Sequence, residues 1–256
     1  MLKNWFEVCL RKFYQLMAKR FLKKNQALWD SLQIYLTKTE STGCGYIDYA
    51  ELYKAVKNSS AKEVLELGSG VTTLIIAHAL MEKHLELGVL GRVTSMDEHE
   101  FWFNMSKKLM PEKYMPYIDF VFSETLDDYY SLFRGVKYLN TPKRKYDFVF
   151  IDGPTYTSKA DHSPTFDFDF IDILKRSELP VSALIDKRVS TVFVLQKILG
   201  YEKVTYCPIK GLGFVYPVTK NDLGNLSKKI DTTNFVKSFR FFRRTKLDIT
   251  SNVNED

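Results

Sequence analysis

Acidic side chains follow the ends of short apolar runs, and these are the residues whose types and spacing could do chemistry. Asp152 follows an apolar run at 148–151, and Asp186 follows another at 181–185. Continuous runs of this kind indicate strands buried on both faces, and the carboxyl ends of parallel strands meet at one edge of an open sheet. Carboxylates there can act as general bases, and so can a histidine, which titrates near neutral pH. Asp152, His162 and Asp186 are therefore the candidate catalytic residues.

A glycine turn is the candidate ligand site. Residues 61–80 read AKEVLELGSGVTTLIIAHAL, in which Gly68 and Gly70 separate a short apolar run from a segment of helical spacing. This is the pattern of a buried strand, a tight turn and a helix whose free N–H groups and positive dipole end face the turn. Glycine also lets a ligand approach the backbone closely. Glu66 precedes the turn, and a carboxylate there suits a cationic ligand group better than a pyrophosphate.

The turn departs from the dinucleotide-binding fingerprint G-x-G-x-x-G, because Thr73 occupies the place of the third glycine. The stretch VLELGSGVTT instead resembles motif I of the class I S-adenosylmethionine-dependent methyltransferases. FIDGP, at residues 150–154, resembles their motif IV in its DGP form. The turn at 186–188 also resembles methyltransferases of this type, among them sugar and polysaccharide O-methyltransferases. The resemblance covers about residues 40–219.

The resemblance implies S-adenosylmethionine as the cofactor and assigns residues to it. Asp97, at the tip of the second expected strand, would accept hydrogen bonds from the ribose hydroxyls. Ser123 and Glu124 fall where the family contacts adenine. The full set of expected cofactor-binding residues is Glu66, Gly68, Ser69, Gly70, Thr72, Thr73, Asp97, Glu98, Ser123, Glu124 and Asp152.

The elements that must position these residues alternate along the chain, which predicts an α/β fold. Strands are expected at 64–67, 91–97, 118–122, 148–151, 181–185, 202–207 and 213–218. Helices are expected at 2–22, 26–36, 47–57, behind the glycine turn, and at 168–176 and 190–199. We therefore expect a Rossmann-like, seven-stranded, mostly parallel sheet with helices on both faces and a terminal antiparallel hairpin.

Length and composition favour one substantial domain with basic extensions. The 256 residues are 45% hydrophobic and 27% charged, which is ordinary for a soluble globular protein. We divide them into a basic helical N-terminal extension (1–39), a methyltransferase domain (40–219) and a basic, aromatic C-terminal tail (220–256). No apolar run has the length of a membrane span and no signal peptide is visible, so a cytoplasmic location is expected. The three cysteines are expected to be reduced thiols.

The basic ends suggest partners beyond a small molecule. The helix at 2–22 has an apolar face and a basic face, which suits packing on the domain, a dimer seam or peripheral contact with an anionic membrane. The tail mixes phenylalanines with basic residues, which suits a strap on the domain better than nucleic-acid binding. An oligomer is left open.

The acceptor site is expected between Asp152, the loop at 155–164 and the turn at 186–188. Lys187 and Arg188 would favour an acceptor that bears a carboxylate or phosphate, since arginine can grip either through two hydrogen bonds. No metal ion is expected, because a lysine beside Asp186 disfavours a divalent cation.

The predicted function is S-adenosylmethionine-dependent methyl transfer to a small anionic acceptor, such as an acidic sugar or a small carboxylated metabolite, with O-methylation favoured. Two alternatives stay open. One is another Rossmann-like enzyme, either an NAD-dependent oxidoreductase or an aminopropyltransferase. The other is a non-catalytic cofactor-binding module that docks through its basic ends.

Overall fold

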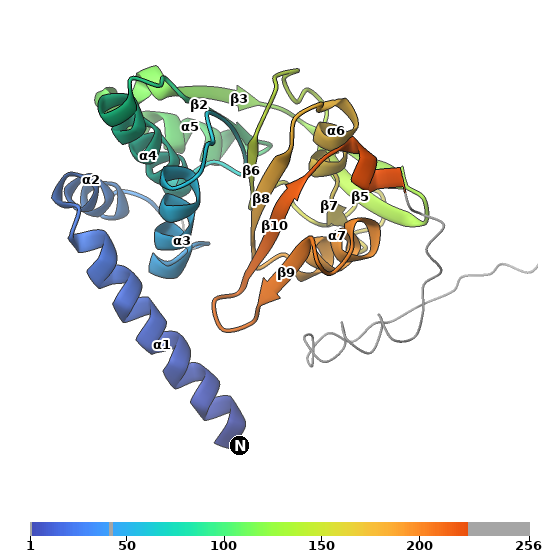
Figure 1. Cartoon of the computed structure of the whole chain (residues 1–256), viewed down its shortest axis with the longest axis horizontal. Coiled ribbons are helices and arrows are strands. Elements are labelled where there is room, and N and C mark those ends of the chain that lie inside the picture. Colours follow the sequence, from blue (N-terminus) through green and yellow to red (C-terminus); the bar gives the residue numbers. More distant parts are fainter. Residues whose placement is uncertain (1, 41–42, 225–256) are drawn as a thin grey trace, which may run out of the picture.

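A seven-stranded sheet forms the centre of the protein. In the computed structural model, which describes residues 2–40 and 43–224, the strand order is β3-β2-β1-β6-β8-β10-β9 (Figure 1). These strands are β1 (Glu63–Leu67), β2 (Arg92–Asp97), β3 (Ile118–Phe122), β6 (Phe148–Ile151), β8 (Val181–Asp186), β9 (Val204–Cys207) and β10 (Leu212–Val218). The strands from β3 to β8 run parallel, whereas β10 is antiparallel to both of its neighbours. The predicted fold class is confirmed, including the terminal hairpin.

Helices cover both faces of this sheet and enclose two hydrophobic cores. They are α1 (Leu2–Lys23), α2 (Gln26–Leu36), α3 (Tyr46–Lys57), α4 (Val71–Leu87), α5 (Glu100–Leu109), α6 (Asp169–Arg176) and α7 (Val189–Leu199), with short 3-10 helices η1 (Glu112–Tyr117) and η2 (Lys220–Gly224). α2, α3 and α4 build one core, and α6 and α7 build the other. Every residue of β6 is buried. The core on each face explains the unbroken apolar run in the sequence of this strand.

A second, three-stranded sheet was not predicted. It consists of β4 (Thr125–Tyr130), β5 (Phe133–Tyr138) and β7 (Phe166–Asp167), with β5 in the middle. Two adjacent acids interrupt the apolar pattern of β4, so this segment lacks the alternation that predicts a strand. Basic residues of β5 pair with these acids, with Arg134 Nε 3.1 Å from Asp127 and Lys137 Nζ 2.5 Å from Asp128. Opposite charges across an antiparallel pair stabilise the hairpin.

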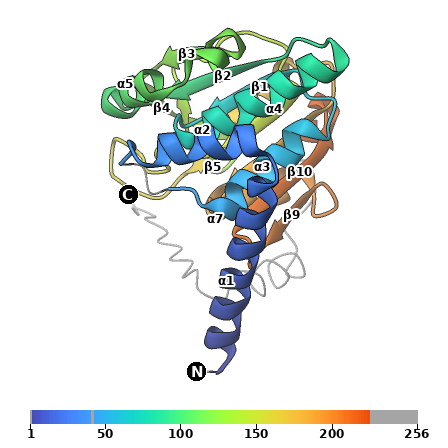
Figure 2. The same ribbon diagram turned by 90° about the vertical axis from the view of Figure 1, so that its left-hand side faces the viewer.

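α1 projects from the body of the protein (Figures 1 and 2). Its last turn joins the first core through Leu22, which is fully buried. Of the three alternatives given for its apolar face, packing on the domain accounts for only part of that face, because Phe13 and Met17 are 55% and 45% exposed. No helix in the described part of the chain combines the length and the apolar character needed to cross a bilayer. Residues 225–256, which make up most of the basic tail, lie outside the described residues. The structure therefore tests neither interpretation of the tail, the strap nor the nucleic-acid binding segment.

Candidate functional site

Two glycine turns touch where β1 and β6 end. A Cβ atom on Gly153 would lie only 2.6 Å from the nitrogen of Gly68, and one on Gly68 would lie 3.0 Å from the carbonyl of Asp152. Gly68 also has a φ of +95°, a conformation that residues with side chains rarely adopt. Both positions therefore require glycine, because the two backbone turns approach each other too closely for a Cβ atom to fit between them. This contact sets Asp152 directly beside the candidate ligand turn.

The second glycine of the ligand turn faces open space. A Cβ atom on Gly70 would have no heavy atom within 4 Å. The neighbouring Ser69 is bonded to the tip of β2, since its N–H and hydroxyl donate to Asp97 Oδ2 at 3.1 and 2.7 Å. The N–H of His99 donates to the other oxygen of Asp97 at 2.9 Å. Burial raises the pKa of Asp97, and these hydrogen bonds offset part of the rise.

Glu66 is completely buried beneath the turn. Its Oε2 accepts hydrogen bonds from Thr73 at 2.5 Å and from Ser95 at 2.7 Å. Its Oε1 is buried without a hydrogen-bond partner among the described residues. Burial raises the pKa of Glu66 to about 7. The hydroxyl of Thr73 thus faces the protein interior and is not available to a ligand, contrary to expectation. Thr72 lies in the first turn of α4 and is also buried, and its contact with the cofactor stays a prediction.

The residues after β2 and β3 form hydrogen bonds within the protein that the sequence did not predict. Glu98 accepts hydrogen bonds from the N–H and hydroxyl of Thr155, both at 2.8 Å, and from the hydroxyl of Tyr138 at 2.9 Å. Burial raises the pKa of Glu98, but the hydrogen bonds from Thr155 and Tyr138 act together against burial, and the pKa stays below its usual value. Ser123 is buried, and its hydroxyl accepts from the N–H of Asn140 at 3.0 Å. Of the expected adenine contacts, Glu124 is the exposed one.

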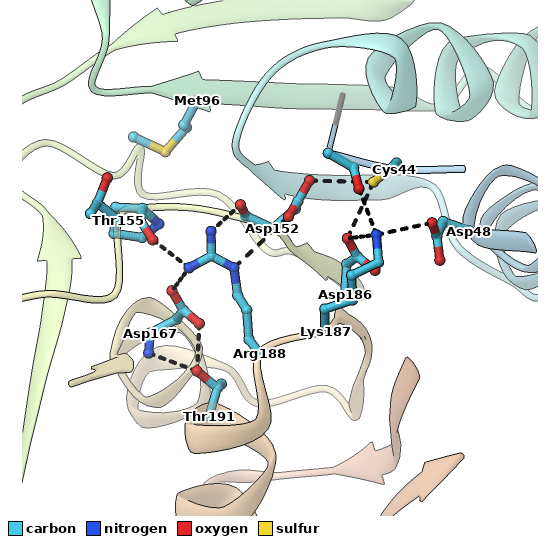
Figure 3. A network of polar contacts seen from close by, with 12 residues as sticks. Cys44, Asp48, Met96, Asp152, Thr155, Asp167, Asp186, Lys187, Arg188 and Thr191 are labelled. Carbon is cyan, nitrogen blue, oxygen red and sulfur yellow. Dashed lines mark hydrogen bonds and ion pairs between the residues drawn. The ribbon is translucent and has the colours of Figure 1, made fainter. Parts of the chain in front are cut away.

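Asp152 and Asp186 come together at the carboxyl ends of β6 and β8, as predicted (Figure 3). The thiol of Cys44 lies 3.4 Å from an oxygen of each carboxylate. Burial, together with the nearby charges of Asp152 and Asp48, raises the pKa of Asp186 to about 7. Burial also raises the pKa of Asp152 and the pKa of the Cys44 thiol. Cys44 was missed because a single cysteine in a loop carries no signal in the sequence.

Lys187 supplies a positive charge inside this acidic cluster. Its ammonium donates to the carbonyl of Gly43 at 2.5 Å and lies 3.4 Å from Asp48 and 3.3 Å from Asp186. Ligand atoms of Cys44, Asp48 and Asp186 lie within 4.8 Å of one another, close enough to hold a metal ion. Such an ion would have to displace the ammonium. Lys187 is therefore a partner of the protein's own carboxylates, which contradicts its predicted role in holding an anionic acceptor.

Arg188 points into the protein, so the prediction that it grips an acceptor is wrong (Figure 3). Its guanidinium bonds the buried carboxylate of Asp167 at 2.6 Å, and it also donates to the carbonyls of Asp152 and Pro154. The side chain is only 11% exposed. Arg188 thus clamps the turn after β6 to the start of α7. Asp167, which no sequence pattern singled out, is its counter-ion.

His162 is not brought to the carboxylates. It is exposed in the loop at 155–164, and its N–H donates to the carbonyl of Ser158 at 3.0 Å. Within the described residues, no contact joins its imidazole to Asp152 or Asp186. The loop is held to the second sheet instead, because Asp161 pairs with Arg134 at 2.6 Å. The geometry leaves the two aspartates as the candidate bases.

Comparison with known proteins decides the class of enzyme. The family model of a methyltransferase domain matches residues 65–176, a segment that runs from β1 to the end of α6. The predicted class of enzyme, a methyltransferase, is thereby confirmed, while the acceptor and the methylated atom stay predictions. No curated protein matches the chain.

Two solved structures are similar to the chain at low identity. One is a methyltransferase-like protein from Silicibacter pomeroyi, with 16% identity over 78% of this chain and 96% of that chain and a TM-score of 0.42. The other is a dimethyladenosine transferase from Plasmodium falciparum, with 13% identity over 77% and 69% of the two chains and a TM-score of 0.40.

Proposed function

We propose that this methyltransferase uses S-adenosylmethionine and transfers its methyl group to an acceptor bound beside Asp152 and Asp186. The observation that carries the proposal is the open space at Gly70, which lies at the start of α4 between the tips of β1 and β2. There a ligand can contact the backbone directly. The carboxylates of Glu66, Asp97 and Asp152 stand at the carboxyl ends of β1, β2 and β6, which are adjacent strands. A donor with an ammonium group, a sulfonium and a ribose diol complements these groups.

The residues around Gly70 fit such a donor. A carboxylate offers about four lone-pair sites, and protein donors use three of those on Asp97. Capacity is left on Asp97 Oδ1 for a ribose hydroxyl. The buried Oε1 of Glu66, which has no hydrogen-bond partner among the described residues, would be a second acceptor on the side of β1. When bound, S-adenosylmethionine supplies an electrophilic methyl carbon.

On the acceptor side, Asp186 would take the proton that the acceptor loses. A general base works best when its pKa is near the working pH, and burial raises the pKa of Asp186 to about 7. The contact of Asp152 with the glycine turn would place the acceptor next to the donor. Alignment of this kind is the main requirement of an in-line displacement.

Charge at the site favours a neutral or cationic acceptor that carries an O–H or N–H group. Lys187 and Arg188 are both bound to carboxylates of the protein, and Asp152 and Asp186 lie side by side. An acceptor with its own carboxylate or phosphate would add negative charge to this cluster, where the described residues offer no unpaired cation to neutralise it. The preference for oxygen over nitrogen stays a prediction.

Calorimetric titration tests the donor. We expect the folded protein to bind S-adenosylmethionine and its demethylated product in the micromolar range, and NAD not at all. Gly70→Val should abolish binding by filling the open space. Gly88→Val is the matched control, because Gly88 also has a positive φ with nothing within 4 Å but lies at the far end of α4. Absence of heat with both methyl-donor ligands, on protein shown to be folded, would refute the proposal.

A further inference from the structure

The middle of α1 presents an apolar stripe that the other described residues do not cover. Phe13, Leu16 and Met17 lie at spacings of three and four residues, which places them on one face of the helix. They are 55%, 47% and 45% exposed. Exposed apolar groups that gather on one face mark an interaction site, whereas scattered ones need no explanation.

The opposite face of the same helix binds the domain, which fixes how the stripe is presented. The N–H of Ile47 donates to Gln15 Oε1 at 3.2 Å, and Ala18 and Leu22 pack on the first core. These three residues of α1 are again spaced by three and four. The stripe therefore lies on the side of α1 opposite to the one that contacts the domain.

Positive charge flanks the stripe. Between residues 8 and 24 the helix and its end carry six basic residues and no acid: Arg11, Lys12, Lys19, Arg20, Lys23 and Lys24. Arg20 follows Met17 by three residues and Phe13 by seven, so it continues the same face toward the domain. Among the described residues, no ion pair neutralises any of these six side chains. Apolar and basic groups on one exposed helix face complement a partner that has anionic groups at its surface and apolar groups directly beneath them.

We propose that α1 docks the protein on an anionic lipid surface. Phe13, Leu16 and Met17 enter the boundary between headgroups and acyl chains, and Lys12, Arg20 and Lys24 contact the lipid phosphates. A second copy of the chain is a poorer occupant. Two α1 helices paired about a two-fold axis would place like charges against each other, with no acid on either helix between residues 8 and 24 to offset them.

Vesicle co-sedimentation of the full chain tests the proposal. We expect binding to vesicles of equal parts phosphatidylcholine and phosphatidylserine, weak or no binding to phosphatidylcholine alone, and loss of binding as salt is raised. Phe13→Glu with Met17→Glu should weaken binding by more than about tenfold. Lys12→Gln with Arg20→Gln should weaken binding and reduce its dependence on salt.

The matched control is Leu85→Glu with Leu87→Glu, which adds the same charge at two apolar residues of α4 that are 75% and 66% exposed. It should leave vesicle binding intact. Equal losses in both double variants, equal binding to neutral vesicles, or no sedimentation of the full chain would overturn the proposal. So would a dimer in sedimentation equilibrium that Phe13→Glu with Met17→Glu dissociates while vesicles fail to bind the parent protein. Circular dichroism should confirm that all variants are folded.

Discussion

The carboxylates of Asp152 and Asp186 share one hydrogen-bond donor, the thiol of Cys44, which lies 3.4 Å from an oxygen of each. A single S–H can serve only one of them at a time. The two acids are therefore a coupled pair whose protons are lost in two steps that belong to the pair.

Asp152→Asn should lower the pKa of Asp186, because it removes the negative charge that raises this pKa most. Carboxyl-carbon NMR titration of the folded protein measures this change without an acceptor. Asp119→Asn is the control, since Asp119 pairs with Arg144 near the amino end of β3. An unchanged titration of Asp186 in Asp152→Asn would show that the two carboxylates do not interact.

Turnover should rise as the pH increases through about 7, because Asp186 acts as a base only after it loses its proton and burial raises its pKa to about 7. Asp186→Asn should lower kcat by about 10²–10⁴ and remove this rise. His162→Ala should leave kcat nearly unchanged. Formation of the demethylated product, followed by mass spectrometry, reports turnover on a panel of neutral, amine-bearing and anionic acceptors. Activity confined to the anionic acceptors would contradict the proposed charge preference.

Asp97→Ala should weaken the binding of S-adenosylmethionine by about 1–3 kcal/mol, which corresponds to the loss of charged hydrogen bonds. Titration calorimetry with Asp119→Ala as the control measures the difference. Wild-type affinity in Asp97→Ala would remove this residue from the donor site.

Arg188→Gln should destabilise the protein in the absence of any ligand. It leaves the carboxylate of Asp167 buried without its partner, and breaking a buried pair from one side typically costs about 3–5 kcal/mol. Urea denaturation gives the free energy of unfolding. If Arg188→Gln were as stable as the parent but defective in acceptor binding, the arginine would belong to the acceptor site after all.

Asp169 should make stability depend on pH. Burial raises its pKa from 3.8 to about 7, so the folded protein holds this proton more tightly than the unfolded chain does. The free energy of unfolding should therefore fall as the pH rises from about 4 to about 7, by roughly 2–4 kcal/mol from this group. Asp169→Asn should remove that part of the fall in urea titrations. Asp172→Asn on the same helix, where the side chain is 32% exposed, should retain it.

Patterns local to the chain were enough to predict the central sheet. Apolar runs such as 148–151 reflect burial on both faces, and the glycines of the ligand turn reflect backbone geometry, so both are visible in one sequence. The ion-pair partner of a charged side chain, by contrast, is often distant in the sequence, so local patterns do not predict it. Lys187 and Arg188 follow a strand tip as predicted, yet their partners Asp48 and Asp167 are 139 and 21 residues away. Cys44 likewise gains its place only because α3 packs beside β8.

The contact between Gly68 and Gly153 also locks the alignment of β1 with β6. The two strands pair with Leu67 opposite Ile151, and the glycines meet just beyond this pair. A slip by one residue would press a side chain, from Ser69 or Asp152, into the place where two bare backbones now touch. It would also turn every side chain of the slipped strand to the other face of the sheet. The spacing between the glycine turn at 68–70 and Asp152 is therefore as rigid as the sheet itself.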